Sequence, residues 1–335
     1  MEGTVRRIRI ASIAALVVAC LHLVFGAIVR ITGSGLGCGD NWPKCYGHWF
    51  PPMNRPDLIV EVSHRYLASI LVVTVLTLLA FCWAQRRTPG VAGKGGPLRT
   101  ATGAALAVLG AAVLGGVTVK LGNDPYATVA HWLMAMTLLA FVAATAIRAG
   151  TLGGASAVTQ HGTRKTARGA IAAAVLAIFA VAMGGFTANF PGAAVGCKGF
   201  PSCAAPADAM PGATAVQITH RTIALLLLLH LIGMVIRSSR RADREAPVVL
   251  LASRIALTLV VLQFGVAASM VLGHLPPVLR SLHEATGVGI WLGCFSFAYL
   301  AYRASRTAAD SPALEARTAP APHTMAVIVA RGADL

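Results

Sequence analysis

Long apolar runs separated by short polar stretches fill the chain between residues 10 and 302. Each run has about 20 residues, the length that an α-helix needs to cross the hydrocarbon core of a bilayer. The pattern predicts eight spans, at residues 10–30, 62–84, 100–120, 127–148, 169–190, 215–236, 248–272 and 281–302. The expected fold class is therefore an all-α integral membrane protein. The runs lack the alternation that an outer-membrane β-barrel requires.

The polar stretches divide the basic residues unevenly between the two sides of the predicted membrane. Only 12% of the 335 residues are charged, about half the share of a soluble domain. The net charge is +16, but Lys and Arg lie in short clusters between apolar runs, so we expect no nucleic-acid partner. One side carries 20 basic and 6 acidic residues, and the other carries 8 basic and 6 acidic residues. The positive-inside rule therefore places both termini in the cytoplasm.

The chain also repeats itself at an offset of about 155 residues. Four landmarks recur in order: a cysteine pair, an aromatic-proline pair between the cysteines, a His-Arg pair and a later histidine. In the first half they are Cys38 and Cys45, Trp42-Pro43, His64-Arg65 and His131. In the second half they are Cys197 and Cys203, Phe200-Pro201, His220-Arg221 and His283. Such a repeat predicts two tandem, pseudo-symmetric four-helix bundles of the same orientation.

The repeat sets the predicted organisation of the chain. Residues 1–165 form the N-terminal four-helix half, and residues 166–303 form the C-terminal four-helix half. Residues 304–335 are rich in Ala, Pro and Arg. This composition predicts a disordered cytoplasmic tail.

The repeated histidines all lie near the starts of spans that begin at the extracytoplasmic side. In each half, two histidines at one depth can face each other across a bundle and hold a flat macrocycle, a haem, by both axial positions. We expect His64 to pair with His131, and His220 with His283. A zinc site fits less well because it needs three or four clustered donors. A lone membrane histidine is ordinarily a core residue, although His22, without a repeat partner, lies where polar groups are often functional.

The halves differ three residues before the His-Arg pair, where Glu61 in the first corresponds to Gln217 in the second. Residues three apart share a helix face, so Glu61 is expected beside the group that His64 binds. A buried carboxylate is costly unless it is used or paired. This predicts proton or charge chemistry in the first half, and retention of a macrocycle in the second. Alternatively, Glu61 only interacts with the helix dipole.

Two further sets of residues admit two interpretations each. Arg65 and Arg221 could pair with haem propionates, or could anchor helix ends at the membrane interface. Each cysteine pair lies in one outer loop, where disulfides form, so we expect the bridges Cys38–Cys45 and Cys197–Cys203. The bridges could be structural or could exchange electrons or thiols with a partner.

With these residues in view, the chain resembles the haem A synthase family, whose members convert haem O to haem A for cytochrome oxidase. The resemblance runs over residues 8–303 and is closest to the bacterial form with two cysteine pairs. It rests on the loop motif Thr32-Gly-Ser-Gly-Leu-Gly-Cys38 with Trp42-Pro43 and Cys45, on Glu61 to Arg65, on His131, on Thr219-His220-Arg221 and on His283.

The resemblance implies that the first half oxidises a ring methyl of haem O to the formyl of haem A by successive hydroxylation. His64 and His131 would bracket this substrate, and Glu61 would be the catalytic carboxylate. In the second half, His220 and His283 would ligate the iron of a cofactor haem B. A haem O synthase would supply the substrate, to a multi-pass enzyme in the cell membrane of a bacterium, and the electron acceptor is unidentified.

One alternative function uses the same histidines. A di-haem b-type membrane electron-transfer subunit would hold two chemically unaltered haems, but it leaves Glu61 and the outer cysteine pairs unexplained. A transporter fits less well, because the candidate ligands lie near one face rather than at the midplane.

Overall fold

The computed structural model describes residues 2–153 and 162–318. Within them, eight helices are long and apolar enough to cross a membrane, which confirms the predicted number of spans. They are α1 (Glu2–Ile31), α2 (Pro56–Ala84), α3 (Pro97–Lys120), α4 (Pro125–Arg148), α6 (Arg164–Asn189), α7 (Ala213–Ser239), α8 (Pro247–Leu272) and α9 (Pro277–Thr318). Short 3-10 turns lie at Thr151–Gly153, Ala193–Val195 and Ala242–Arg244. Proline opens α2, α3, α4 and α8, where its missing N–H costs no helical hydrogen bond.

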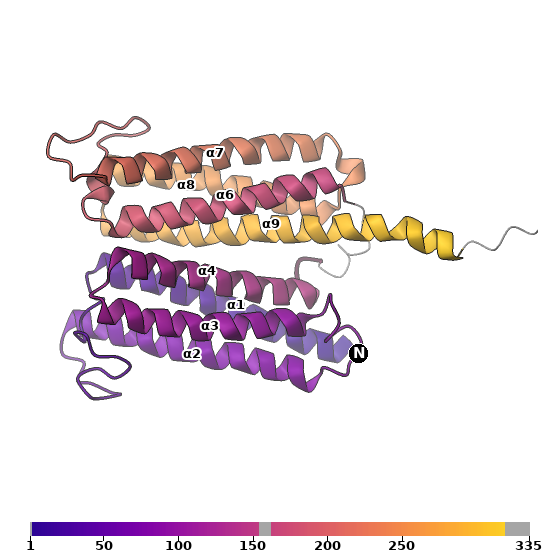
Figure 1. Cartoon of the computed structure of the whole chain (residues 1–335), viewed down its shortest axis with the longest axis horizontal. Helices are drawn as coiled ribbons and strands as arrows, with labels where there is room; N and C mark the ends of the chain where they lie inside the picture. Colours follow the sequence, from indigo (N-terminus) through magenta and orange to yellow (C-terminus); the bar gives the residue numbers. More distant parts are fainter. Residues whose placement is uncertain (1, 154–161, 319–335) are drawn as a thin grey trace, which may run out of the picture.

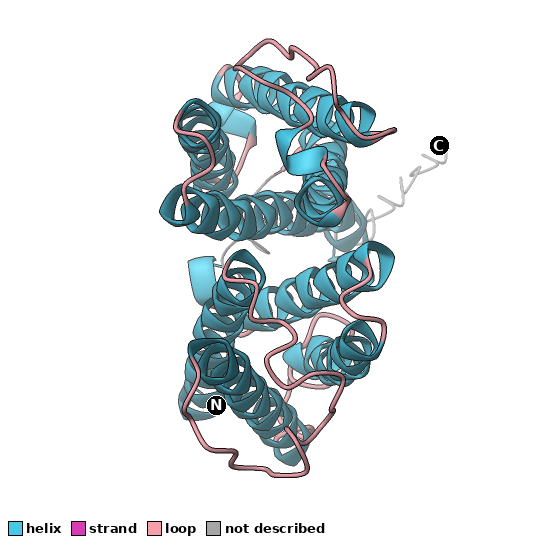
Figure 2. Ribbon diagram, turned by 90° about the vertical axis from the view of Figure 1, so that its left-hand side faces the viewer, coloured by secondary structure: helices cyan, strands magenta, loops and turns pink. Residues whose placement is uncertain are grey.

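The helices form two four-helix bundles that lie side by side (Figure 1). In the first bundle α1 packs on α2, α2 on α3, α3 on α4 and α4 on α1. The second bundle repeats this order with α6, α7, α8 and α9. Viewed from the end, the two bundles appear as two rings of helices (Figure 2). The tandem architecture expected from the sequence repeat is therefore present.

The two bundles meet through α1 and α4 on one side and α6 and α9 on the other. The indole N–H of Trp291 donates to the carbonyl of Met136 at 2.8 Å. At one end of this contact, Arg148 donates to the hydroxyl of Tyr299 at 2.5 Å. Because these hydrogen bonds join residues of different halves, they fix the register between the halves.

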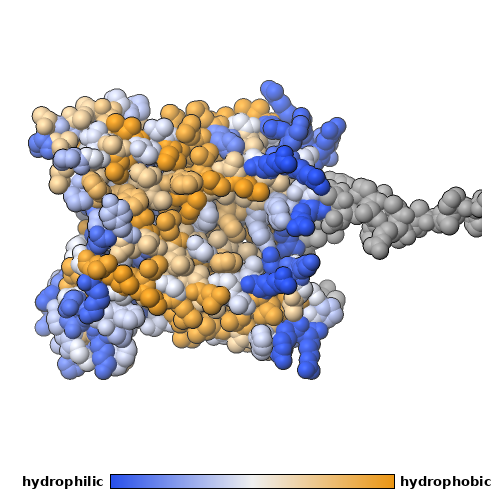
Figure 3. All heavy atoms as spheres, viewed as in Figure 1, coloured by the Kyte–Doolittle hydropathy of each residue, from blue (hydrophilic) through white to orange (hydrophobic). Residues whose placement is uncertain are grey.

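On the face that Figure 3 shows, apolar residues cover the middle of the molecule and hydrophilic residues gather at its two ends. Large apolar side chains such as Leu106, Val113 and Leu251 are exposed on the helices, as expected for surfaces that face lipid. The most strongly hydrophilic residues lie at the end where α1 begins (Figure 3). The opposite end holds the loops that precede α2 and α7 (Figure 1).

The last helix, α9, extends past residue 304, where the tail was expected to begin, and ends at Thr318. A helix that a membrane span has already nucleated gains one hydrogen bond for each added residue, and the Ala and Arg of this region favour helix. Composition therefore underestimated the length of α9. Residues 319–335 of the predicted tail lie outside the described residues.

Candidate functional site

The four repeated histidines lie near the N-terminal ends of α2, α4, α7 and α9. Successive helices run in opposite directions, so these four helices all begin at the end of the molecule that holds the two cysteine loops (Figure 1). The structure thus places His64, His131, His220 and His283 at a common depth, as the repeat predicted.

In the second half, His220 and His283 line one cavity of about 450 Å³. Their ring centroids are 6.4 Å apart, and the ring planes are 75° apart. The His220 Nδ1 is hydrogen-bonded to the carbonyl of Ala180 at 3.1 Å. Gly184 admits the ring, because a Cβ there would lie 3.0 Å from the His220 Cε1. A metal–imidazole bond is about 2 Å long, so the space between the two rings suits one iron ion.

The walls of this cavity are mostly apolar but include several charged side chains. Arg30, Arg221 and Arg280 line it, and Glu284 is the single carboxylate among the described residues of the lining. Arg30 of α1 forms an ion pair with Glu284 of α9, which links the two halves beside His283. The Nη2 of Arg221 is buried and has no hydrogen-bond partner among the described residues. An excess of cations in an apolar cavity suits a flat, apolar ligand that carries carboxylates.

The first half holds its two histidines differently. The His131 Nδ1 is hydrogen-bonded to the carbonyl of Ala111 at 2.9 Å. The His64 ring stacks on His22, with centroids 4.3 Å apart and planes 6° apart. His22 has no counterpart in the sequence repeat, so only the structure reveals its contact with His64. Among the described residues, no group of three or more His, Cys, Asp or Glu side chains could hold a metal ion.

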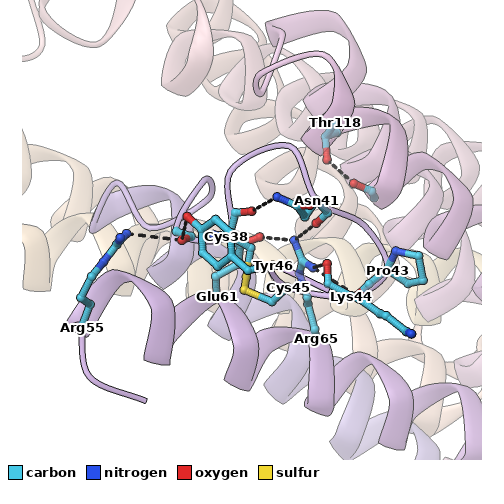
Figure 4. Close-up of polar contacts among 12 residues, drawn as sticks. Cys38, Asn41, Pro43, Lys44, Cys45, Tyr46, Arg55, Glu61, Arg65 and Thr118 are labelled. Atoms are coloured by element: carbon cyan, nitrogen blue, oxygen red, sulfur yellow. Dashed lines mark hydrogen bonds and ion pairs between the residues drawn. A yellow bond between two sulfur atoms is a disulfide. The ribbon is translucent and has the colours of Figure 1, made fainter. Parts of the chain in front are cut away.

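Glu61 lies at the centre of a polar cluster beneath the first cysteine loop (Figure 4). Its side chain is buried, with 3% of the residue exposed. The Oε1 accepts a hydrogen bond from Arg65 at 2.5 Å, and the Oε2 accepts one from the backbone N–H of Cys38 at 2.8 Å. Arg65 also donates to the carbonyls of Asn41, Pro43 and Lys44. The carboxylate thus joins α2 to the disulfide loop, a contact that the helix-dipole interpretation did not include.

The second half has the same arginine contact without the carboxylate. Arg221 donates to the carbonyls of Gly199, Pro201 and Ser202 in the second cysteine loop. The Oε1 of Gln217 is buried and has no hydrogen-bond partner in the described part of the chain. Both arginines therefore hold a loop against a helix end, and only the first half adds an ion pair to this contact. The i, i+4 spacing of Glu61 and Arg65 was the signal available in the sequence.

Both predicted disulfides are present. Cys38 and Cys45 are bridged with Cα atoms 5.0 Å apart, and Cys197 and Cys203 are bridged with Cα atoms 4.8 Å apart. The first bridge lies next to Glu61, because the backbone N–H of Cys38 donates a hydrogen bond to the Glu61 carboxylate. The second bridge contributes Cys203 to the lining of the cavity.

Comparison with known proteins agrees with this arrangement. The family model COX15-CtaA, described as cytochrome oxidase assembly protein, matches residues 9–295. A Heme A synthase of Geobacillus kaustophilus is 27% identical over 317 residues, which cover 89% of this chain and 93% of that protein. A Heme A synthase of Shouchella clausii is 28% identical over 76% of this chain and 83% of its own length.

A third relative carries a different name. A Protoheme IX farnesyltransferase of Thermus thermophilus is 42% identical over 86 residues, which are 26% of this chain and 13% of that protein. The match of the family model, by contrast, extends over both four-helix bundles and all four repeated histidines. The chain belongs to the COX15-CtaA family of cytochrome oxidase assembly proteins.

Proposed function

We propose that the protein is a haem A synthase, which oxidises a ring methyl of haem O to the formyl of haem A. The observation that carries the proposal is the duplicated histidine site in which one repeat position holds a buried carboxylate, Glu61, in the first copy and Gln217 in the second. The Heme A synthases that resemble the chain over most of its length support it. The two halves then have different tasks, substrate oxidation in the first and cofactor retention in the second.

The second half is the proposed haem B site. His220 and His283 would hold the iron, because both line one cavity with their rings 6.4 Å apart. Arg221 and Arg280 line the same cavity and would neutralise the propionates. A haem with two histidine ligands supplies one-electron transfer when it is bound.

The first half is the proposed haem O site, bracketed by His64 and His131. With both axial positions of the substrate iron taken by histidine, molecular oxygen has no place to bind there. We infer that two electrons leave the ring for an acceptor outside the protein while the methyl group loses one proton, and that water then adds to the carbon and loses a second proton. Glu61 would accept a proton or stabilise the positive charge that develops at the methyl group. Its hydrogen bonds to Arg65 and Cys38 hold the carboxylate in place for this role.

The same proposal orients the protein in a bacterial cell membrane. The side with 20 basic residues would face the cytoplasm together with both termini, and the histidines would lie toward the outer face. A protoheme IX farnesyltransferase, which is a haem O synthase, is the proposed supplier of the substrate. The stretch that the chain shares with the Thermus thermophilus farnesyltransferase supports this pairing. The electron acceptor would be a separate molecule that binds to the protein.

Haem analysis tests the proposed function. Expressed in a bacterium that makes haem O but has no haem A synthase of its own, the protein should yield haem A on extraction, identified by chromatography and mass spectrometry. With His64→Ala or His131→Ala, the extract should contain haem O and no haem A. A di-haem electron-transfer subunit would instead contain two unaltered haems of the b type, and finding only these would refute the proposal.

Isotope labelling tests the source of oxygen. Water trapping predicts that the hydroxylated intermediate, isolated after turnover in H₂¹⁸O, carries the heavy isotope. The intermediate must be measured as well as the aldehyde, because a formyl group exchanges its oxygen with water. Label that comes only from ¹⁸O₂ would show that molecular oxygen is inserted, and would remove the water step.

A further inference from the structure

The His64 ring lacks the hydrogen bond that orients two of its counterparts. The Nδ1 of His131 and that of His220 are each bonded to a backbone carbonyl. The Nδ1 of His64 is buried and has no hydrogen-bond partner in the described part of the chain. A histidine that ligates a metal ordinarily donates its second ring N–H to such a partner, which fixes the ring orientation. The Nδ1 of His283 also has no partner among the described residues, so His64 and His283 both need another contact to fix the ring.

Helix α1 supplies that contact through three residues of one face. His22 stacks on the His64 ring at 4.3 Å, with the planes 6° apart. Phe25 lies nearly parallel to the same ring, with centroids 6.2 Å apart and planes 9° apart. Gly26 allows the close approach, because a Cβ there would lie 3.1 Å from the His64 Cε1. The spacing i, i+3, i+4 places all three residues on one side of α1.

In the second half, a backbone carbonyl orients the ring of His220. Ala180 of α6 offers its carbonyl to the His220 Nδ1, and Gly184, four residues later, admits the ring. His22 and Gly26 have the same spacing of four residues on α1. By this alignment His22 occupies the place of Ala180, so a stacked ring in the first half replaces a hydrogen bond in the second.

Burial makes the presence of His22 costly. The residue is 9% exposed, inside a membrane span, and its Nδ1 has no hydrogen-bond partner among the described residues. An apolar side chain of similar size would avoid the cost of an unbonded buried polar atom. The close and nearly parallel stack on His64 is the contact that accounts for an aromatic ring at this position.

We propose that His22 is a positioning residue of the first site: its ring sets the plane in which the His64 imidazole meets the iron of the substrate haem. The inference rests on the proposed function, in which His64 is a ligand of haem O. Stacking requires a flat ring and not a ring nitrogen. Phenylalanine should therefore replace His22, and leucine should not.

The test uses full-length protein isolated with haem B from a host that makes no haem O. Purified haem O is then titrated into it, and the Kd and the electron paramagnetic resonance spectrum of the ferric, bound haem O are measured. His22→Leu should weaken haem O binding about tenfold and shift the g values. His22→Phe should behave as the wild type. In each variant, an unchanged haem B spectrum of the second half reports correct folding.

His230→Leu is the matched control, because His230 is a histidine of a membrane span bonded to the carbonyl of Gly169. It should leave haem O binding unchanged. The inference is overturned if His22→Leu keeps the wild-type Kd and g values, if His22→Phe is as impaired as His22→Leu, or if His230→Leu gives the same loss. His64→Ala separates the two hypotheses: if haem O binds equally well without His64, then the proposed role of His64 fails, whatever His22 does.

Discussion

Glu61→Gln is expected to lower the rate of haem A formation by about 100-fold or more, because charge stabilisation at the reacting group contributes on this scale. Glutamine keeps the volume of the side chain, and its carbonyl can still accept the Cys38 N–H. What it removes is the negative charge. Haem O should therefore bind but accumulate, unconverted or as a hydroxylated intermediate. Single-turnover assays with product identification by mass spectrometry measure both effects.

Arg65→Gln distinguishes catalysis from support of the loop. This variant removes the hydrogen bonds to Asn41, Pro43 and Lys44 and the ion pair with Glu61, but it keeps the negative charge of Glu61 and its hydrogen bond from the Cys38 N–H. If Glu61 acted only by holding the loop, both variants would lose the same activity and the same integrity of the Cys38–Cys45 bridge. We expect a clearly larger loss of turnover in Glu61→Gln. Equal losses, or a normal yield of haem A from Glu61→Gln, would remove Glu61 from the chemistry.

His220→Ala and His283→Ala are expected to lower the haem B content of the purified protein about tenfold or more, because each removes one of two axial ligands. The alanine also enlarges a cavity that already has about 450 Å³, and among the described residues no other histidine lines that cavity. Pigment extraction and the reduced-minus-oxidised spectrum measure the loss. Haem O binding in the first half should persist, since its proposed ligands belong to α2 and α4.

His230→Ala serves as the comparison for these variants, because His230 lies on α7 with His220 but bonds to Gly169 of α6. Its haem B content should equal that of the wild type. Full haem B content in both His220→Ala and His283→Ala would show that the second cavity does not use these ligands. Loss of haem in His230→Ala would instead indicate general damage to the bundle.

The fold could be predicted from the sequence because the bilayer imposes its constraint locally. A helix must satisfy its own backbone and must be apolar for about 20 residues, so each span is visible in a single segment. The internal repeat then supplied the tandem arrangement and the common depth of the histidines. The continuation of α9 beyond residue 304 was missed, since composition alone did not show that an existing helix would extend into a polar region.

The parts of the site that could not be predicted depend on contacts between segments. Glu61 was identified by comparing the two halves, but its hydrogen bond to the Cys38 N–H depends on how the loop folds back over α2. Haem propionates or the membrane interface were the two interpretations of Arg65 and Arg221, and their hydrogen bonds to loop carbonyls depend on contacts that the sequence does not specify. The His22–His64 stack depends on how α1 rotates against α2, and no spacing within either helix specifies that rotation.

The arginine contacts have a consequence for the sulfur chemistry of the two loops. Each loop is closed on itself by a disulfide and is joined to its helix by an arginine that donates to several loop carbonyls. Reducing the disulfide leaves the contact between arginine and loop in place. The thiols of Cys38 and Cys45 would then stay close to each other near Glu61. They could re-form the same disulfide, or react with a thiol oxidoreductase while the loop keeps its position.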